Sequence, residues 1–317
     1  MTEITTIGEV LIDLTQTGVN GQNVPVFAAN PGGAPANVAV AAARLGASAA
    51  FIGKVGRDGF GAYLTGVLTE NGVDASGVRA DETPTTMAVV TVAPGGERSF
   101  RFVRGADALL TEDEVDTALI EGSKVLHFGS VSLTAEPARS ATLFAARHAR
   151  EHGVLVSYDP NYREALWPDQ EEAVARMCAP LPLADVLKLS DEELPLLTGT
   201  DDPAEGTRRL ADRGVSLVLL TLGGEGAFWR WQGETGLVPG VATAVADTNG
   251  AGDTFLGAVL SRLVRRGERP LEGLTVRELE DILAFANRAA SKTCSRSGAI
   301  PAMPTLAELE VGEEAGR

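Results

Sequence analysis

Two carboxylates surround a run of small residues in the stretch DTNGAGDTF at 247–255. Gly250, Ala251 and Gly252 let backbone N–H groups approach a ligand closely, and the apolar run that follows predicts a helix whose positive N-terminal end faces them. Asp253 then lies in the first turn of that helix, where a carboxylate can accept a proton from an alcohol while the amides stabilise a phosphoryl group. Taken alone, an Asp at this position is more often a plain helix cap.

A second small-residue turn lies near the N-terminus, in the stretch NPGGAPANVAVAAARLG at 30–46. Two glycines precede Pro35, which is typical of a helix start, and Asn37 follows on the side of the turn. The missing side chains would let a ligand approach closely. A tight strand-to-helix turn packed on a sheet predicts the same residues, so this stretch leaves both interpretations open.

The elements that must position these turns follow a regular order from about residue 120. Short β-branched runs alternate with helical patterns: the strands KVLHF, VLVSY, DVLKL and SLVLLT, and helices around 135–151, 170–178 and 203–213. Such alternation indicates βαβ units. The sequence therefore predicts an α/β fold with a doubly wound, mostly parallel sheet and helices on both faces.

Two segments break this rhythm. Residues 14–31 are rich in Thr, Gly, Asn and Gln, and residues 85–104 contain two alternating strands around a Pro-Gly-Gly turn. We expect them to form a small antiparallel β lid that covers a pocket and excludes water, with a decorative edge hairpin as the alternative. Because nothing resembling a linker interrupts the chain, residues 1–317 are predicted to form a single domain.

Charge and composition exclude several classes of protein. Lys and Arg number 27 and Asp and Glu 43, for a formal net charge of −16, which disfavours nucleic acid and anionic membranes as partners but does not forbid a small anion held by backbone amides. Cys178 and Cys294 are too few for a disulfide framework or a thiolate zinc site. Without a signal-like N-terminus or an apolar span, a cytoplasmic location is predicted.

The three histidines give weaker signals. His148-Ala-Arg-Glu151-His152 matches the H-x-x-E-H pattern of some zinc peptidases. The match falls at the C-terminal end of a predicted helix, directly before Gly153, where His and Arg suit the helix dipole, so the zinc interpretation is weak. His127 lies in an apolar strand and is predicted to be a buried core residue.

Together the two small-residue turns resemble the paired signatures of the ribokinase/PfkB-type carbohydrate kinases, and the resemblance covers essentially the whole chain. Six further stretches in chain order strengthen it: GEVLIDL, VGRDGFG, FRFVRGADALL, YDPNYREALW, KLSDEEL and TLGGEGAF. The third and fourth are similar to fructokinases rather than to ribokinases or adenosine kinases.

The resemblance implies an ATP-dependent kinase that phosphorylates a primary hydroxyl of a ketohexose, converting D-fructose to fructose 6-phosphate, with ATP, Mg²⁺ and K⁺. It also implies a possible homodimer through the β lid. Within the family, 2-keto-3-deoxygluconate or another sugar is the alternative substrate, because sugar choice rests on a few pocket groups. From other classes, a catalytically idle sugar-binding or regulatory protein on the same fold and a zinc peptidase remain alternatives.

The resemblance also implies roles in catalysis and sugar binding. Asp253 would be the general base, and the amides of Gly250, Ala251 and Gly252 would hold the transferring phosphoryl group. The residues implied to bind the sugar are Asp13, Gly32, Gly33, Asn37 and, from the lid, Arg104.

For the nucleotide site, the implied residues are Thr221, Gly223 and Gly226, with Asn287 near the adenine. For a monovalent cation, they are Asp247 and Asn249 with backbone carbonyls around Cys294 and Gly298. One departure stands out, since relatives often carry Asn-x-x-Glu where this chain has Ser190 and Glu193. Glu193 can still orient Mg²⁺ through water, whereas Ser190 is shorter than Asn, and Lys188 is expected to supply a positive charge instead.

Overall fold

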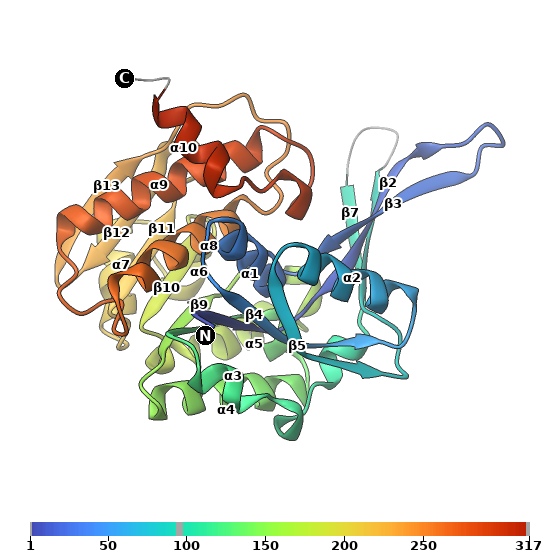
Figure 1. The fold of residues 1–317 in the computed structure, drawn as a ribbon, viewed down its shortest axis with the longest axis horizontal. Coiled ribbons are helices and arrows are strands. Elements are labelled where there is room, and N and C mark those ends of the chain that lie inside the picture. Colours follow the sequence, from blue (N-terminus) through green and yellow to red (C-terminus); the bar gives the residue numbers. More distant parts are fainter. Residues whose placement is uncertain (1, 93–97, 315–317) are drawn as a thin grey trace.

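The structure is a computed structural model and describes residues 2–92 and 98–314. Its main sheet has nine strands within these ranges, in the order β13-β12-β11-β10-β9-β8-β1-β4-β5 (Figure 1). Strands β5 to β11 along this order pair in parallel, and β12 and β13 add an antiparallel edge. The strand bounds are β1 Ile4–Ile7, β4 Ala49–Gly56, β5 Val73–Asp81, β8 Val125–Gly129, β9 Leu155–Asp159, β10 Val186–Ser190, β11 Leu217–Thr221, β12 Gly226–Trp231 and β13 Glu234–Pro239.

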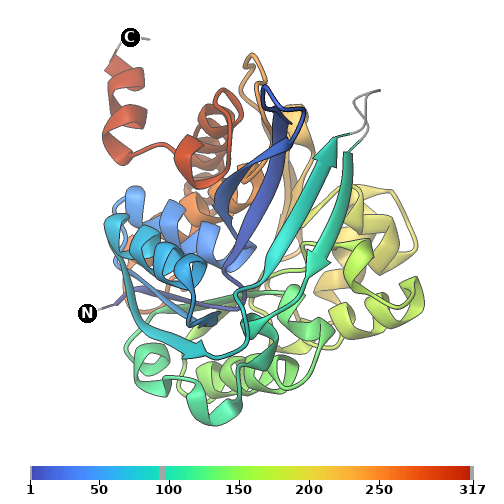
Figure 2. The ribbon, with the colours of Figure 1, turned by 90° about the vertical axis from the view of Figure 1, so that its right-hand side faces the viewer.

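Helices cover both faces of this sheet, which confirms the predicted doubly wound fold (Figures 1 and 2). One face carries α1 Ala34–Arg44, α2 Gly59–Glu70, α8 Ala251–Leu263 and α9 Val276–Cys294. The other carries α4 Ala138–Glu151, α5 Gln170–Cys178, α6 Glu193–Thr198 and α7 Pro203–Ala211. Two further short helices are α3 Thr117–Glu121 and α10 Leu306–Glu314.

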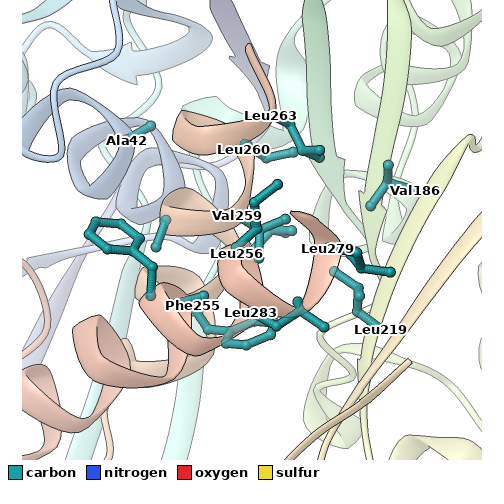
Figure 3. Close-up of a cluster of buried hydrophobic side chains, with 14 of the residues drawn as sticks. Ala42, Val186, Leu219, Phe255, Leu256, Val259, Leu260, Leu263, Leu279 and Leu283 are labelled. Atoms are coloured by element: carbon teal, nitrogen blue, oxygen red, sulfur yellow. The ribbon is translucent and has the colours of Figure 1, made fainter. Parts of the chain in front are cut away.

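The buried strands alternate their apolar side chains between the two helical layers. In β10 and β11, Val186 and Leu219 pack against α8 and α9, whereas Leu187 and Leu220 belong to the core under α4 to α7. Figure 3 shows Val186 and Leu219 facing leucines of α8 and α9. A sheet buried on both faces needs apolar residues at nearly every position, which is why these strands are continuous hydrophobic runs.

Helices α1 and α8 pack closely against each other, and this contact depends on Gly257. A Cβ placed there would lie 2.6 Å from the Cβ of Ala41 and 2.9 Å from the carbonyl oxygen of Val38, closer than side chains normally pack. The alanine-rich α1 can therefore lie directly against α8. This packing brings together the N-terminal ends of the two helices, and with them the two small-residue turns of the sequence.

The predicted lid is present as a second sheet with the order β3-β2-β6-β7, and its strands project away from the main body (Figure 1). Figure 2 shows this sheet face-on, in front of the body. Its strands are β2 Leu11–Val19, β3 Pro25–Gly32, β6 Met87–Val92 and β7 Arg98–Val103. Each of its two hairpins is antiparallel, and a parallel pairing of β2 with β6 joins them. The predicted Pro-Gly-Gly turn lies outside the described residues, and the assignment of 1–317 to a single domain stays a prediction.

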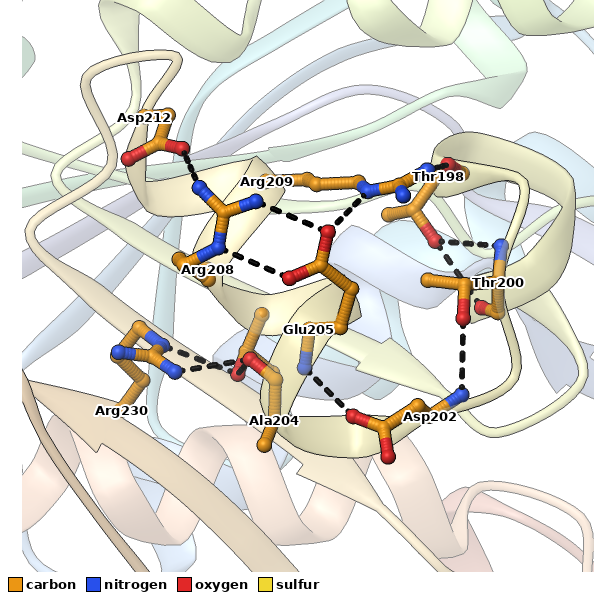
Figure 4. Close-up of polar contacts among 10 residues, drawn as sticks. Thr198, Thr200, Asp202, Ala204, Glu205, Arg208, Arg209, Asp212 and Arg230 are labelled. Carbon is orange, nitrogen blue, oxygen red and sulfur yellow. Dashed lines mark hydrogen bonds and ion pairs between the residues drawn. The ribbon is translucent and has the colours of Figure 1, made fainter.

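Helix α7 is held at the antiparallel edge by a surface network of charges (Figure 4). Asp202 caps its N-terminus by accepting a hydrogen bond from the backbone N–H of Glu205 at 2.7 Å. The hydrogen bonds that Arg208 and Arg209 donate to Glu205 lower the pKa of that carboxyl to about 2. Arg230 of β12 donates to the carbonyl oxygen of Ala204 at 2.8 Å, which ties the helix to the sheet.

None of the helices in residues 2–92 and 98–314 is long and apolar enough to cross a membrane. Even the 19-residue α9 carries Glu278, Asp281 and Arg288 among its charged side chains. The cytoplasmic location stays a prediction.

Candidate active site

Asp253 and Asn37 meet where the N-terminal ends of α8 and α1 converge. The Asn37 side-chain Nδ2 donates to Asp253 Oδ2 at 2.8 Å, although the two residues are 216 positions apart. Asp253 is 8% exposed, and this burial raises the pKa of its carboxyl, while the hydrogen bond from Asn37 lowers it. The two residues thus form an oriented, buried carboxylate that is a stronger base than an exposed Asp.

A buried cation lies against the small-residue turn beside this base. Lys188, in β10, places its Nζ 3.0 Å from Asp159 Oδ2 at the end of β9. A Cβ on Gly252 would lie 2.9 Å from the same Nζ. Burial lowers the pKa of Lys188, but the negative charges of Asp159, Glu193 and Asp253 outweigh it and the pKa is raised, so the ammonium is positive at neutral pH.

The turn itself has the backbone geometry that the sequence predicts. Gly250 is the N-cap of α8 and has a left-handed φ of 73°, and Asp253 is in the first turn. One of the three amides is engaged, because Ala251 N donates to the Thr248 carbonyl at 3.2 Å. With Lys188 beside it, the turn combines amide donors with a full positive charge, which suits an anionic group.

Two adjoining cavities open beside this base and run under the lid. The smaller, of about 110 Å³, is lined by Gly33, Asn37 and Asp253 together with the lid residue Phe102. The larger, of about 1000 Å³, lies between the lid and the loops at 162–165, 247–249 and 297–301. The residues that line both are Asp13, Phe102, Arg163, Asn249 and Ala299.

Asp13 and the two glycines predicted beside it are in close contact. Asp13 is in β2, and a Cβ on Gly32 of β3 would lie 3.1 Å from the Asp13 carboxyl carbon. Gly33 has a φ of 108°, and a Cβ there would lie 2.5 Å from the Glu9 carbonyl oxygen. Burial raises the pKa of Asp13 to about 6. A side chain at Gly32 would collide with the Asp13 carboxylate, and one at Gly33 would collide with the backbone of Glu9 and strain the positive φ.

Arg104 follows β7 at the base of the lid and is held there by two neighbours. Its Nη2 lies 2.9 Å from Asp107 Oδ2, and its Nη1 donates to the Thr134 hydroxyl at 2.7 Å. Within the described residues it is not among those that line the two cavities. Its contact with a sugar stays a prediction, which requires the guanidinium or the lid to move.

Glu9 supports the helix start beneath this site. It is 2% exposed, and its Oε1 accepts a hydrogen bond from the backbone N–H of Ala34, the first residue of α1. Burial raises the pKa of Glu9 from 4.5 to about 7. The carboxyl is therefore a titratable group at the start of α1, and Glu9 lines the smaller cavity together with Gly33 and Asn37.

The Glu9 carboxyl predicts a pH dependence of stability. Between pH 4.5 and about 7 the folded state holds a proton that the unfolded state has released, so the free energy of unfolding decreases as pH rises through this window, by on the order of 3 kcal/mol. Glu9→Gln keeps an acceptor for Ala34 N–H and removes the titration. Urea unfolding at pH 5 and pH 8 should show a smaller decrease for Glu9→Gln than for the wild type. Equal decreases in the two proteins would contradict the assignment.

Glu193 and Ser190, the pair that departs from the family pattern, bind each other. Glu193 Oε2 accepts from Ser190 N at 2.7 Å and from Ser190 Oγ at 3.0 Å. Its Oε1 accepts from the backbone N–H of Tyr162 at 2.6 Å. The buried carboxylate therefore joins the end of β10 to the loop after β9, and Ser190 contributes to holding it.

The residues predicted for the nucleotide site gather at the carboxyl end of β11. Thr221 ends this strand, and the following turn has positive φ at Gly223 (54°) and Gly226 (112°). Asn287 of α9 donates its Nδ2 to the carbonyl oxygens of Val238 and Pro239 at 3.1 and 3.0 Å, which fixes α9 to the end of β13. The carboxyl ends of parallel strands are where ligands bind in open α/β sheets.

The four residues predicted to hold a monovalent cation come from two segments, 247–249 and 294–298, that hydrogen bonds join. Asp247 Oδ2 accepts from Gly298 N at 3.0 Å, and Asp247 Oδ1 accepts from Asn249 N at 3.1 Å. The carbonyl oxygen of Cys294 accepts from Asp247 N at 3.2 Å. These two segments adjoin the larger cavity through Asp247, Asn249 and Gly298.

Three of the site residues that sequence reasoning missed come from the end of β9 and the stretch after it. Asp159 pairs with Lys188, Asn161 has a φ of 42° and lines the smaller cavity, and Arg163 lines both cavities. Burial raises the pKa of Asp13 and of Asp253, and the Arg163 charge offsets part of that rise. The available signal was a polar run directly after a predicted parallel strand, in a stretch already noted for its resemblance.

A buried base, a cation beside an amide-lined turn, and a lid over the cavity define a phosphotransferase of the ribokinase-like fold. Residues 1–306 match the model of the pfkB family carbohydrate kinases. The chain belongs to this family, and the zinc peptidase interpretation is wrong.

Several fructokinases match this chain over nearly its whole length. Fructokinase-1 of Oryza sativa subsp. japonica is 44% identical over 312 residues, which is 96% of each chain. The fructokinase of Xylella fastidiosa with bound ATP has a TM-score of 0.92 at 33% identity and full coverage of both chains. A double mutant of the Vibrio cholerae O395 fructokinase, bound to fructose, ADP and potassium ion, has a TM-score of 0.86 at 34% identity and 98% coverage of each chain.

Proposed function

We propose that the protein transfers the γ-phosphoryl group of ATP to the 6-hydroxyl of D-fructose, giving fructose 6-phosphate and ADP. The observation that carries the proposal is the contact of Asn37 with Asp253 at the mouth of a cavity under the lid. The fructokinase relatives support the choice of sugar. Phosphoryl transfer requires positioning, charge neutralisation and exclusion of water, and the site supplies a group for each.

In the proposed reaction, Asp253 accepts the proton of the sugar hydroxyl as its oxygen attacks the γ-phosphorus, and the bond to the ADP oxygen breaks. Asn37 orients the carboxylate through its hydrogen bond. Lys188 and the amides at 250–252 stabilise negative charge on the phosphoryl oxygens. Asp13 and the turn at Gly32 and Gly33 hold the other sugar hydroxyls under the lid.

The cation sites are part of the proposal. Glu193, buried near Lys188, is the carboxylate proposed to orient Mg²⁺ through water, and the ion, bound to ATP, would neutralise phosphate charge. A monovalent cation fits the loop at 247–249 and 294–298, where a carboxylate and backbone carbonyls supply the oxygen ligands that such ions prefer. Bound potassium would add positive charge near the turn at 250–252.

A turnover assay over a panel of sugars tests the proposal. ADP release is measured with fructose, glucose, ribose and 2-keto-3-deoxygluconate, with potassium or sodium as the monovalent cation. We expect fructose to give the highest kcat/KM and potassium to raise kcat. A preference for the ketoacid would favour the alternative kinase, and no turnover with any sugar would favour an idle binding protein.

Arg104→Ala is expected to raise the KM for fructose with little change in the KM for ATP. The reason is that Arg104, held by Thr134 and Asp107 at the base of the lid, is proposed to move over the sugar when the lid closes. The matched control is Arg101→Ala, since Arg101 is an exposed residue of β7, the strand that directly precedes Arg104. An effect confined to ATP would contradict this role.

We also propose that the lid mediates a homodimer. The exposed apolar side chains of the β2–β3 hairpin, Val19, Val24, Val26 and Phe27, form the surface for it. Light scattering on the wild type and on Val26→Asp tests the point. We expect a dimer that the charge dissociates, and a monomeric wild type would contradict it.

A further inference from the structure

We propose that Glu121, His148 and His152 form a surface binding site for a divalent transition-metal ion of the zinc class. The three side chains offer two imidazole Nε2 atoms and one carboxylate oxygen, all within 4.8 Å of one another. Imidazole and carboxylate are ligands that Zn²⁺, Cu²⁺ and Ni²⁺ accept. No step of sugar phosphorylation uses this cluster.

The spacing of the ligand atoms is close to what a tetrahedral ion requires. Glu121 Oε1 lies 2.8 Å from His148 Nε2 and 3.9 Å from His152 Nε2. Metal bonds of about 2.0–2.1 Å set tetrahedral ligand atoms about 3.4 Å apart. These two distances fall on either side of this value and all three ligand atoms lie within 4.8 Å of one another, so side-chain rotations are needed to bring them to one ion.

Helix geometry brings the two histidines together. They are four residues apart at the end of α4, which places them on one face of the helix, and their rings stack with centroids 4.1 Å apart. Glu151, the acid of the H-x-x-E-H pattern, is not in the cluster. The third ligand comes instead from Glu121, the last residue of α3, so the site is formed by the fold rather than by the local motif.

The hydrogen bonding of His152 prepares it to bind a metal. Its Nδ1 lies 2.9 Å from the carbonyl oxygen of His148, and since a carbonyl only accepts, Nδ1 carries the proton. The neutral ring therefore presents a lone pair at Nε2, on the side of Glu121. A second hydrogen bond that fixes the tautomer is typical of metal-binding histidines. In His148, the Nε2 proton now shared with Glu121 would move to Nδ1 through solvent.

The cluster is accessible and lies far along the sheet from the catalytic groups. Glu121 and His152 have side chains that are 46% and 43% exposed, so an ion can enter and a water can complete its coordination. His152 comes just before β9 begins, whereas Asp159, which pairs with Lys188, is at the other end of that strand. A bound ion would therefore link α3 to α4 without touching the reacting groups.

Zinc titration of the full-length, tag-free protein, without nucleotide and followed by calorimetry, tests the site. We expect one ion per chain. His148→Ala and His152→Ala should each weaken binding by about 10-fold or more, and Glu121→Gln should weaken it as well. Glu151→Gln is the matched control and should bind as the wild type does. Zinc should also raise the thermal midpoint of the wild type and not of the histidine variants.

Cu²⁺ provides a second, spectroscopic readout. The chain has three histidines, and His127 is fully buried in β8, so nitrogen hyperfine structure in the electron paramagnetic resonance spectrum should come from His148 and His152. The signal should disappear in the double His148→Ala/His152→Ala variant. Zinc binding that this variant retains would overturn the proposal. So would the absence of stoichiometric binding by the wild type at about 100 µM zinc, a concentration on the order of the dissociation constant of a weak site.

Discussion

Asp253→Asn is expected to lower kcat by about 10² or more while leaving the fold intact, because a positioned general base contributes on that scale. The substituted side chain has the same shape and keeps an oxygen for the hydrogen bond from Asn37. It loses the negative charge and, with it, the ability to accept the hydroxyl proton. Steady-state kinetics with fructose and ATP measure the effect.

The fold and sugar affinity serve as controls for this variant. Burial makes the Asp253 carboxylate costly to ionise, so the amide should leave the thermal midpoint unchanged or raise it. Fructose binding measured by calorimetry should stay near the wild-type value. Turnover within a factor of three of the wild type would rule out Asp253 as the base.

Lys188→Met should lower kcat by about 10²- to 10³-fold, the scale for removing one preorganised charge from a transition state. The Nζ lies against the turn at Gly252, where the phosphoryl group is proposed to pass. The KM for fructose should change little. Single-turnover measurements at saturating ATP isolate the chemical step.

A double variant separates this catalytic effect from a loss of stability. Removing Lys188 alone leaves the Asp159 carboxylate buried and unpaired, which destabilises a fold by about 3–5 kcal/mol. Lys188→Met/Asp159→Asn removes both charges and should recover most of the stability without recovering kcat. If kcat returned together with stability, the role of Lys188 would be structural.

Much of the fold could be predicted from local patterns, because alternating strands and helices are properties of short windows of sequence. The strands β8 to β11 and the helices α4, α5 and α7 fall where those patterns place them. The antiparallel edge of β12 and β13 and the parallel pairing of β2 with β6 were not predicted. Only the pairing of β2 with β6 joins strands far apart in the sequence, where no local signal exists. Strands β12 and β13 form a tight hairpin in which Trp231 pairs with Glu234, so a local signal was present there and was not used.

The candidate site was predictable in residue type more than in geometry. Small residues and an Asp before a helix identify an anion-binding turn, but the contact of Asn37 with Asp253 depends on the packing of α1 against Gly257 of α8. Lys188 was expected to supply a charge, yet its buried partner Asp159 was not anticipated. For Arg104, the resemblance implies a role in sugar binding, but its ion pair with Asp107 could not be inferred from the stretch that contains both residues.

The most direct test of the account is the identity of the phosphorylated product. The protein is incubated with D-fructose, Mg²⁺, K⁺ and ATP, and the reaction is followed by phosphorus and carbon NMR. The account predicts fructose 6-phosphate and ADP in equal amounts, with formation slowed about 10²-fold or more in Asp253→Asn. Phosphate on another hydroxyl, or no sugar phosphate from the wild type, would contradict it.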